Sequence, residues 1–135
     1  MDQAGQMTFT AQVAAFQPGK KSVPVELVVN GQVVNTVEVS ADGRVQKLAI
    51  PATIQKSSWV ALRVFPSAHT NPIFVVVGNQ PIRASKDSAR WCLAGVEQCW
   101  KMKEKTYAQA EQEQAKADYA HARKEYQRIL EECDR

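Results

Sequence analysis

Closely spaced ionisable side chains of the kind that bind metals or perform catalysis are missing from this sequence. The two histidines, His69 and His121, are far apart in the chain, and no HxH motif, CxxC motif or acidic cluster accompanies them. Zinc sites are built from such closely spaced ligands, and nucleophilic catalysis needs a serine or cysteine beside a positioned base. We therefore expect no catalytic residue, no metal ligand and no cofactor in this chain.

Long apolar runs, a secretion signal and a strong charge imbalance are also missing. No run of about 18 apolar residues occurs, and the first residues, MDQAGQMTFTAQ, lack the basic flank and apolar core of a signal peptide. The net charge is +3, without a basic stripe interleaved with aromatic residues. These absences predict neither a membrane span nor nucleic-acid binding. They favour an intracellular protein or a natural upstream segment outside this sequence.

Cysteine is scarce, and its odd count of three leaves at least one thiol without an intramolecular partner. Cys92 and Cys99 lie on one predicted helix, where their Cα atoms are about 10 Å apart, beyond the reach of a disulfide. We expect these two residues and Cys133 to be free thiols that are buried among packing side chains.

The first 82 residues do contain the alternation and turn chemistry of antiparallel strands. Residues 8–16 alternate between apolar and polar side chains, which predicts a half-buried strand. Asn30 and Gly31 stand between β-branched runs and both tolerate positive φ, which predicts a hairpin over residues 23–39. A further strand is predicted over residues 45–50, ended by Pro51. The buried face of the first strand consists of Phe9, Ala11, Val13 and Ala15.

Two later segments, residues 59–65 and 73–77, are apolar on both faces, as is typical of central strands that are covered on each side. About seven short strands with turns every 8–12 residues predict an immunoglobulin/fibronectin-III-like antiparallel β-sandwich. Because no pair of strand cysteines is present, the fibronectin-like form is favoured. We place this sandwich at residues 1–84.

Residues 85–135 have the three- and four-residue periodicity of helices. Ser85 is a good N-cap for a first helix, and a second is predicted over residues 108–132; the short link between them makes an antiparallel hairpin. The predicted stripes are Ala89, Cys92, Leu93, Val96, Cys99, Trp100 and Lys103 in the first helix, and Ala115, Tyr119, Ala122, Tyr126, Ile129, Leu130 and Cys133 in the second. The fold class is thus mainly β with α, with the hairpin packed on the sandwich as one compact unit. A homodimer through the second stripe, which resembles a coiled-coil seam, is the alternative.

Two groups of residues are candidates for a ligand site or a domain interface. His69, Thr70 and Asn71 join the two most apolar strands, and loops at such an end often bind ligands. The favoured explanation is a simple turn at Asn71-Pro72, with His69 capping exposed carbonyl groups. Trp59 and Trp91, together with Trp100, form either a sugar-stacking platform or a seal between sheet and helices. The seal is favoured, because tryptophans at such junctions usually pack.

Several segments resemble the C-terminal region of the CehA/McbA-family metallohydrolases, which belong to the PHP (polymerase and histidinol phosphatase) superfamily and include carbaryl hydrolase. These segments are VELVVNGQVV, SSWVALRVFPSAHTNPIFVVV, QPIRASKDSARWCLAGVEQCW and ADYAHARKEYQRIL. The resemblance implies that divalent metals and catalytic residues belong to an upstream PHP-type domain of the same polypeptide, whose motifs are absent here. It also implies an exported bacterial protein.

The sequence and the resemblance together favour a non-catalytic C-terminal accessory domain that docks on a PHP-type catalytic domain. The alternative is an immunoglobulin-like module that binds a small ligand or carbohydrate near His69, Asn71 and Trp59. A small independent enzyme is the third reading, for which no constellation of residues is present.

Overall fold

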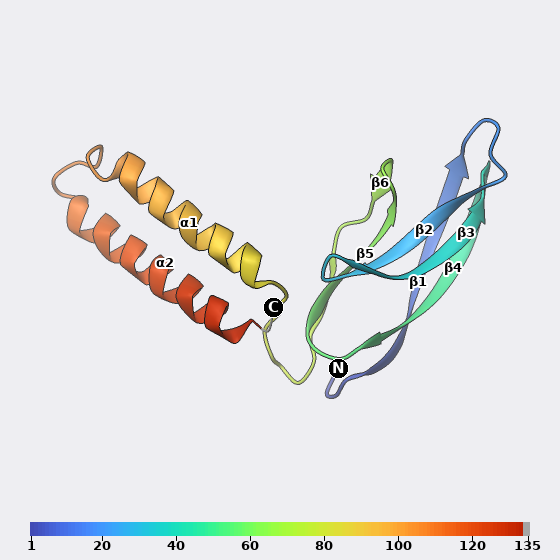
Figure 1. Cartoon of the computed structure of the whole chain (residues 1–135), viewed down its shortest axis with the longest axis horizontal. Helices are drawn as coiled ribbons and strands as arrows, with labels where there is room; N and C mark the ends of the chain where they lie inside the picture. Colours follow the sequence, from blue (N-terminus) through green and yellow to red (C-terminus); the bar gives the residue numbers. More distant parts are fainter. Residues whose placement is uncertain (134–135) are drawn as a thin grey trace. The chain divides into compact units, whose positions relative to one another are not determined.

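The computed structural model describes residues 1–133, whose contacts divide the chain into a unit of Met1–Ile82 and a unit that begins at Arg83 (Figure 1). In these residues the strands precede two helices, which confirms the predicted mainly β structure with a helical C-terminal part. The strands are β1 (Gly5–Phe16), β2 (Ser22–Val29), β3 (Gln32–Ser40), β4 (Asp42–Ile54), β5 (Ser58–Val64), β6 (Ala68–His69) and β7 (Ile73–Val75). The helices are α1 (Lys86–Lys103) and α2 (Gln112–Glu132). Packing of the helices on the strands stays a prediction.

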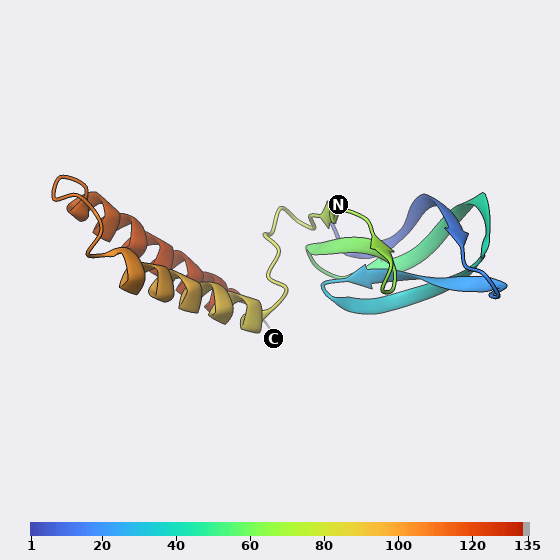
Figure 2. The ribbon, with the colours of Figure 1, turned by 90° about the horizontal axis from the view of Figure 1, so that it is seen from above.

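The strands form two antiparallel sheets that share one hydrophobic core. One sheet pairs β1 with β4, and the other has the order β3-β2-β5-β6, with β7 also paired to β5. Figure 2 shows the β1–β4 ribbon as a layer beside the layer of β2, β3 and β5. Alternate residues of every long strand face the space between the sheets. The core contains Phe9, Val23, Val25, Leu27, Val39, Ala41, Leu48, Ile50, Ile54, Val60 and Val75.

The hairpin between β2 and β3 has the two-residue turn that the sequence predicts. Asn30 and Gly31 have φ values of 49° and 85°, and Val29 pairs with Gln32 across the turn. The Asn30 side chain also fastens the turn to β5, because its Nδ2 donates to Ser58 Oγ at 3.0 Å. Its Oδ1 accepts the Trp59 N–H at 3.0 Å. The turn therefore helps to fix the start of β5.

The predicted end of a strand at Pro51 is wrong, because β4 continues on both sides of the expected range, over Asp42–Ile54. Pro51 pairs with Thr8 of β1, and its carbonyl accepts a hydrogen bond from Asn35 Nδ2 of β3 at 3.0 Å. Its backbone nitrogen therefore points away from β1, where the missing N–H breaks no ladder bond. Proline is tolerated in an edge strand for this reason.

The predicted coverage of both faces also fails for the segment that contains β7. β5 is central, between β2 on one side and β6 and β7 on the other. β7 is instead a short edge strand, in which Val75 is buried while Ile73 and Phe74 are 56% and 66% exposed. Apolar character on both faces therefore identified the central position of β5 correctly, although only the face that contains Val60 lies in the core, and it failed for β7.

The helical unit is an antiparallel pair, with α1 and α2 side by side in both ribbon views. Ser85 is the N-cap of α1 and accepts a hydrogen bond from the Ser88 N–H at 3.2 Å. The predicted stripe of α2 is confirmed, since all of its members are buried or half-buried. The helix itself begins four residues later than predicted, at Gln112, because residues 104–111 form turns.

The three cysteines are free thiols, but their predicted burial is only partly correct. Cys133 is buried and Cys92 half-buried, whereas Cys99 is exposed. Lys103, at the end of the same predicted stripe, is exposed as well. The stripe on α1 is wider than the surface that its one neighbouring helix covers, so the residues at its margin remain open.

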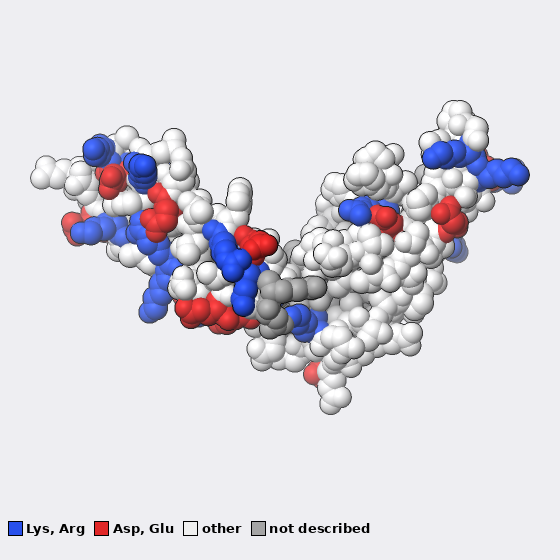
Figure 3. Space-filling view, in the orientation of Figure 1, with Lys and Arg blue, Asp and Glu red and all other residues white. Residues whose placement is uncertain are grey.

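The surfaces of the two units differ in charge. In the view of Figure 3, lysine, arginine, aspartate and glutamate side chains are dense over α1 and α2, while wide areas over the strands carry no charge. No helix within residues 1–133 is both sufficiently long and sufficiently apolar to cross a bilayer.

Candidate binding groove

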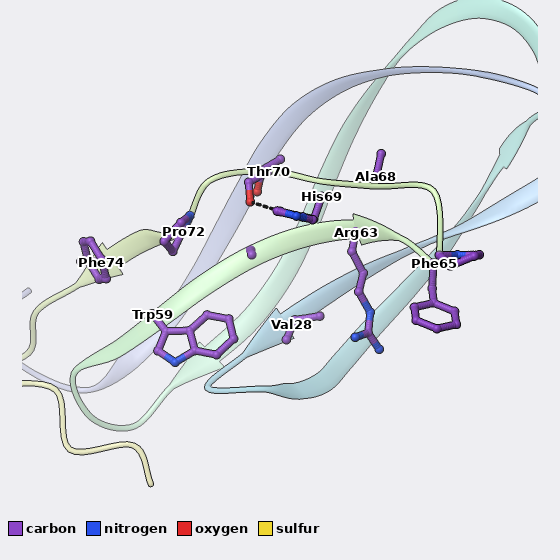
Figure 4. Close-up of a pocket in the computed structure, with 11 residues that line it drawn as sticks. Val28, Trp59, Arg63, Phe65, Ala68, His69, Thr70, Pro72 and Phe74 are labelled. Atoms are coloured by element: carbon purple, nitrogen blue, oxygen red, sulfur yellow. Dashed lines mark hydrogen bonds between the residues drawn. The ribbon is translucent and has the colours of Figure 1, made fainter. Parts of the chain in front are cut away.

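A groove of about 690 Å³ lies on the face of the five-stranded sheet that points away from the core. We name it the β5 groove, because the alternate residues Trp59, Ala61 and Arg63 of β5 form its floor, while Val60 between them faces the core. Figure 4 shows these elements with Trp59, Val28 and Arg63 between the turn at Phe65 and the segment of Phe74. Its lining residues are Val28, Trp59, Ala61, Arg63, Phe65, Pro66, Ala68, His69, Thr70, Pro72 and Phe74.

The groove is mainly apolar and aromatic. Trp59 lies directly opposite Phe74 in the pairing of β5 with β7, and Ala61 lies opposite Val28 in the pairing of β5 with β2. Phe65 and Phe74 are 71% and 66% exposed. Leaving two aromatic rings in water costs about 25 cal/mol for each Å² of apolar surface. Covering the outer face of this sheet with another molecule would therefore lower the free energy.

One ion pair accompanies the aromatic residues. Arg63 Nε donates to Glu26 Oε2 at 2.5 Å, and these residues are register partners in β5 and β2. The Arg63 guanidinium also lies over the Phe65 ring, with Cζ 5.4 Å from the ring centroid. Because Glu26 already balances the positive charge, an anionic ligand would have to compete with this carboxylate. The groove is therefore better suited to apolar and uncharged groups.

The polar corner, which consists of His69, Thr70 and Asn71, is held to β5 by two hydrogen bonds of Thr70, one from its backbone and one to its side chain. The Thr70 N–H donates to the Leu62 carbonyl at 2.9 Å, and the Leu62 N–H donates to Thr70 Oγ1 at 3.1 Å. His69 Nδ1 lies 3.1 Å from the Thr70 carbonyl, and the tautomer protonated at Nδ1 donates this bond and leaves Nε2 as an acceptor. Thr70 therefore has a structural role, whereas His69 still offers one polar atom to a ligand.

The structure brings together three of the five candidate residues. Trp59, His69 and Thr70 all line the β5 groove, whereas Asn71 is exposed and does not. Trp91 belongs to α1 in the helical unit, where it is 78% exposed. It lines a separate depression of about 440 Å³ between α1 and α2, together with Cys92, Gly95, Val96, Cys99, Asp118, Tyr119, Ala122 and Tyr126.

Trp100, the third tryptophan, packs inside the helical unit. Its ring centroid is 5.0 Å from that of Tyr119 and 6.4 Å from that of Tyr107, and the Arg123 guanidinium lies 5.8 Å from its centroid. The hydrogen bond between the Tyr107 and Tyr119 hydroxyl groups raises the pKa of Tyr119 to about 12, with a further contribution from desolvation. These contacts join the end of α1 and the loop after it to α2.

The aromatic and aliphatic lining of the groove was not predicted as a site. Phe65 and Phe74 are 71% and 66% exposed, yet the sequence suggested only that they belong to covered strands. A signal was present, because Trp59, Ala61 and Arg63 alternate with core residues and Phe74 follows the polar corner. Recognising it required knowing that β7 lies at the edge of its sheet.

The described residues, 1–133, contain no group of three or more histidine, cysteine or acidic side chains arranged to hold a metal ion. Comparisons of the chain with known protein families, with curated proteins and with solved structures found no match.

Proposed function

We propose that this chain is a non-catalytic accessory domain that docks on another protein domain through the β5 groove. The observation that carries the proposal is the pair of exposed phenylalanines, Phe65 and Phe74, at the two ends of a mainly apolar groove. Apolar patches of this kind, when they are rimmed by polar residues, mark interaction sites. Each ring offers on the order of 100 Å² of exposed surface, or about 2.5 kcal/mol on burial.

The resemblance to the CehA/McbA family makes a PHP-type metallohydrolase domain the docking partner, with its divalent metals bound by the partner's own residues. Two of the three parts that resemble the family most specifically, SSWVALR and HTNP, contribute Trp59 and His69 to the groove; the third, PIRAS with the SARWC helix, does not line it. In this proposal the unit of Met1–Ile82 is an immunoglobulin/fibronectin-III-like sandwich. Two antiparallel sheets around one core, with the order β3-β2-β5-β6 in one of them, support that classification.

Isothermal titration calorimetry of the full chain against a purified PHP-type catalytic domain of the CehA/McbA family tests the docking. We expect saturable binding that Phe74→Ser weakens by more than about tenfold, since a contact of about 2.5 kcal/mol is lost. Phe16→Ser is the matched control, because Phe16 is 74% exposed on β1 and does not line the groove. Absence of binding, or equal weakening by both substitutions, would contradict the proposal.

A second candidate function is the binding of a small, mainly uncharged ligand such as a carbohydrate. The observation in its favour is the groove volume of about 690 Å³, which lies in the range of small-molecule sites. Trp59 offers a stacking surface and His69 Nε2 an acceptor. A thermal-shift screen of glycans would show a rise in Tm that disappears in Trp59→Ala and His69→Ala, with Asn71→Ala as the control outside the groove.

A further inference from the structure

The backbone of β1 has an unpaired edge. β1 and β4 form a sheet of only two strands, so each strand has one neighbour. Pro51 of β4 directs its nitrogen and its carbonyl away from β1, since the carbonyl accepts from Asn35 Nδ2 at 3.0 Å. Its register partner Thr8 must then point its own N–H and C=O away from β4, because these directions alternate along an antiparallel ladder. The same holds for Gln6, Thr10, Gln12 and Ala14.

Over the described residues, no third strand and no side chain hydrogen-bonds to this outer edge of β1. The neighbouring edges are protected. On β3, the Gln46 side chain accepts from the Ser40 N–H and donates to the Ser40 carbonyl, both at 2.9 Å. β4 contains Arg44, Lys47 and Pro51, and charged residues and proline discourage a further strand from pairing.

β1 has none of these devices, because Gly5–Phe16 contains neither a charged residue nor a proline. Its outward side chains include Thr8, Thr10 and Gln12, all of them exposed. On the inner face, Met7, Ala11 and Val13 are only half-buried. A hollow of about 160 Å³ adjoins Ala11 and Val13, where the two sheets part. The edge therefore has free backbone groups, no repulsive charge and apolar surface still to cover.

We propose that β1 is a dimerisation strand, which pairs antiparallel with β1 of a second copy of this chain across a twofold axis at Thr10. This register uses every outward-pointing residue, since Gln6, Thr8 and Thr10 lie opposite the partner's Ala14, Gln12 and Thr10. It forms about ten backbone hydrogen bonds. The two ribbons then make one four-stranded sheet.

A second copy is the occupant that the side chains of β1 favour. On the inner face of the paired strands, Phe9 lies opposite the partner's Ala11, so a large side chain meets a small one. Met7 lies opposite the partner's Val13 and faces the hollow beside it. On the outer face, threonine meets threonine and glutamine, which are favourable cross-strand pairs. Because β1 is uncharged, self-pairing carries no like-charge repulsion, and the contact is isologous, as in most homodimers.

Sedimentation equilibrium of the full chain over a wide concentration range tests this pairing. We expect a concentration-dependent dimer, which Thr10→Pro weakens by more than about tenfold because it removes outward N–H donors at the axis. Ala49→Pro is the matched control. Ala49 is the register partner of Thr10 on β4, and its N–H points outward at the opposite edge of the same ribbon. A chain that stays monomeric, or a dimer that both substitutions weaken equally, would overturn the proposal.

A pair of charged substitutions at Thr10 tests the position of the twofold axis without placing a proline in the strand. Thr10→Lys and Thr10→Asp each place like charges opposite one another in a dimer centred on Thr10, and each should weaken self-association several-fold at low salt. An equimolar mixture of the two variants should recover the association of the unsubstituted chain. If the mixture associated no more strongly than either variant alone, the register that pairs Thr10 with Thr10 would be refuted. A dimer that is insensitive to all three Thr10 substitutions would place the contact elsewhere, for example on α2, and would refute the strand pairing itself.

Discussion

Ile50 gives the sharpest test of how the two sheets are held together. It lies on β4 of the two-stranded sheet, its side chain is 0% exposed, and it belongs to the core that both sheets share. Ile50→Ala removes three buried carbon atoms and leaves a cavity, because the neighbouring side chains relax only partly. Substitutions of this kind cost about 2–5 kcal/mol.

That loss is a large part of the stability expected for a domain of this size. The unit Met1–Ile82 should be stable by about 4–12 kcal/mol, from roughly 0.05–0.15 kcal/mol per residue. A loss of about 2–5 kcal/mol therefore lowers Tm by roughly 8–40 °C, at about 4–8 °C for each kcal/mol. The matched control is Val45→Ala on the same strand, where the side chain is 66% exposed. It should change stability by less than about 0.5 kcal/mol.

Urea unfolding followed by tryptophan fluorescence measures this difference. Trp91→Phe and Trp100→Phe remove the two fluorophores of the helical unit, so that Trp59 alone reports on the strands. If Ile50→Ala shifted the midpoint no more than Val45→Ala does, the β1–β4 ribbon would not pack on the five-stranded sheet. The shared core would then be refuted.

Three further substitutions have defined outcomes. Ser85→Ala removes the N-cap of α1 and should lower the free energy of unfolding of the helical unit by about 1 kcal/mol, read from thermal unfolding at 222 nm; an unchanged Tm would refute the cap. Arg83, and then Arg128, lower the pKa of Glu132 by hydrogen bonding, so its ionised form stabilises the hairpin above the usual carboxyl pKa. That stabilisation is lost as the pH falls through the lowered pKa, and Glu132→Gln should flatten the Tm profile between neutral and acidic pH. Gly31→Val places a β-branched residue at a φ of 85° and should cost about 1–2 kcal/mol, whereas Gly31→Asn should cost less in the same urea titration; equal costs would contradict the left-handed turn.

Features that depend on a few adjacent residues were predictable from the sequence. The turn at Asn30-Gly31 follows from the tolerance of both residues for positive φ, and the alternation of residues 8–16 gave the correct buried face of β1. The cap at Ser85 and the stripe of α2 are local in the same sense. In each case one segment of chain contains all the information, and no distant partner alters it.

Features that depend on distant pairing were not predictable in this way. Pro51 ends a strand when it is read by itself, but the structure places its nitrogen at the outer edge of β4, where the absent N–H breaks no bond. Cys99 lies on the apolar stripe of α1, yet whether it is covered depends on the width of the neighbouring helix. The division of the strands into a pair and a set of five depends on contacts between residues far apart in the chain.

Only part of the candidate site was predictable, because some of its residues are recognisable locally and others depend on distant strand pairing. The polar corner at His69 and Thr70 can be recognised from its composition, and Trp59 from its size. Phe74 was assigned to a covered strand, because an apolar segment of this length usually lies inside a sheet. Only the sheet order shows that β7 is an edge strand, so the exposure of Phe74 could not be seen in the sequence.

The apolar character of both faces of β5 connects the sequence to the proposed function. A strand whose residues are apolar on both faces is removed from water only when other residues pack against each of those faces. Within the unit Met1–Ile82, the β1–β4 ribbon covers the face that contains Val60, while the face that contains Trp59 forms the β5 groove. Water would be an adequate neighbour if that second face were polar, as in most antiparallel sheets with one solvated side. Because it is aromatic instead, the proposed docking of a second molecule in the β5 groove would account for its composition, and Phe74 is the side chain on which that proposal depends most.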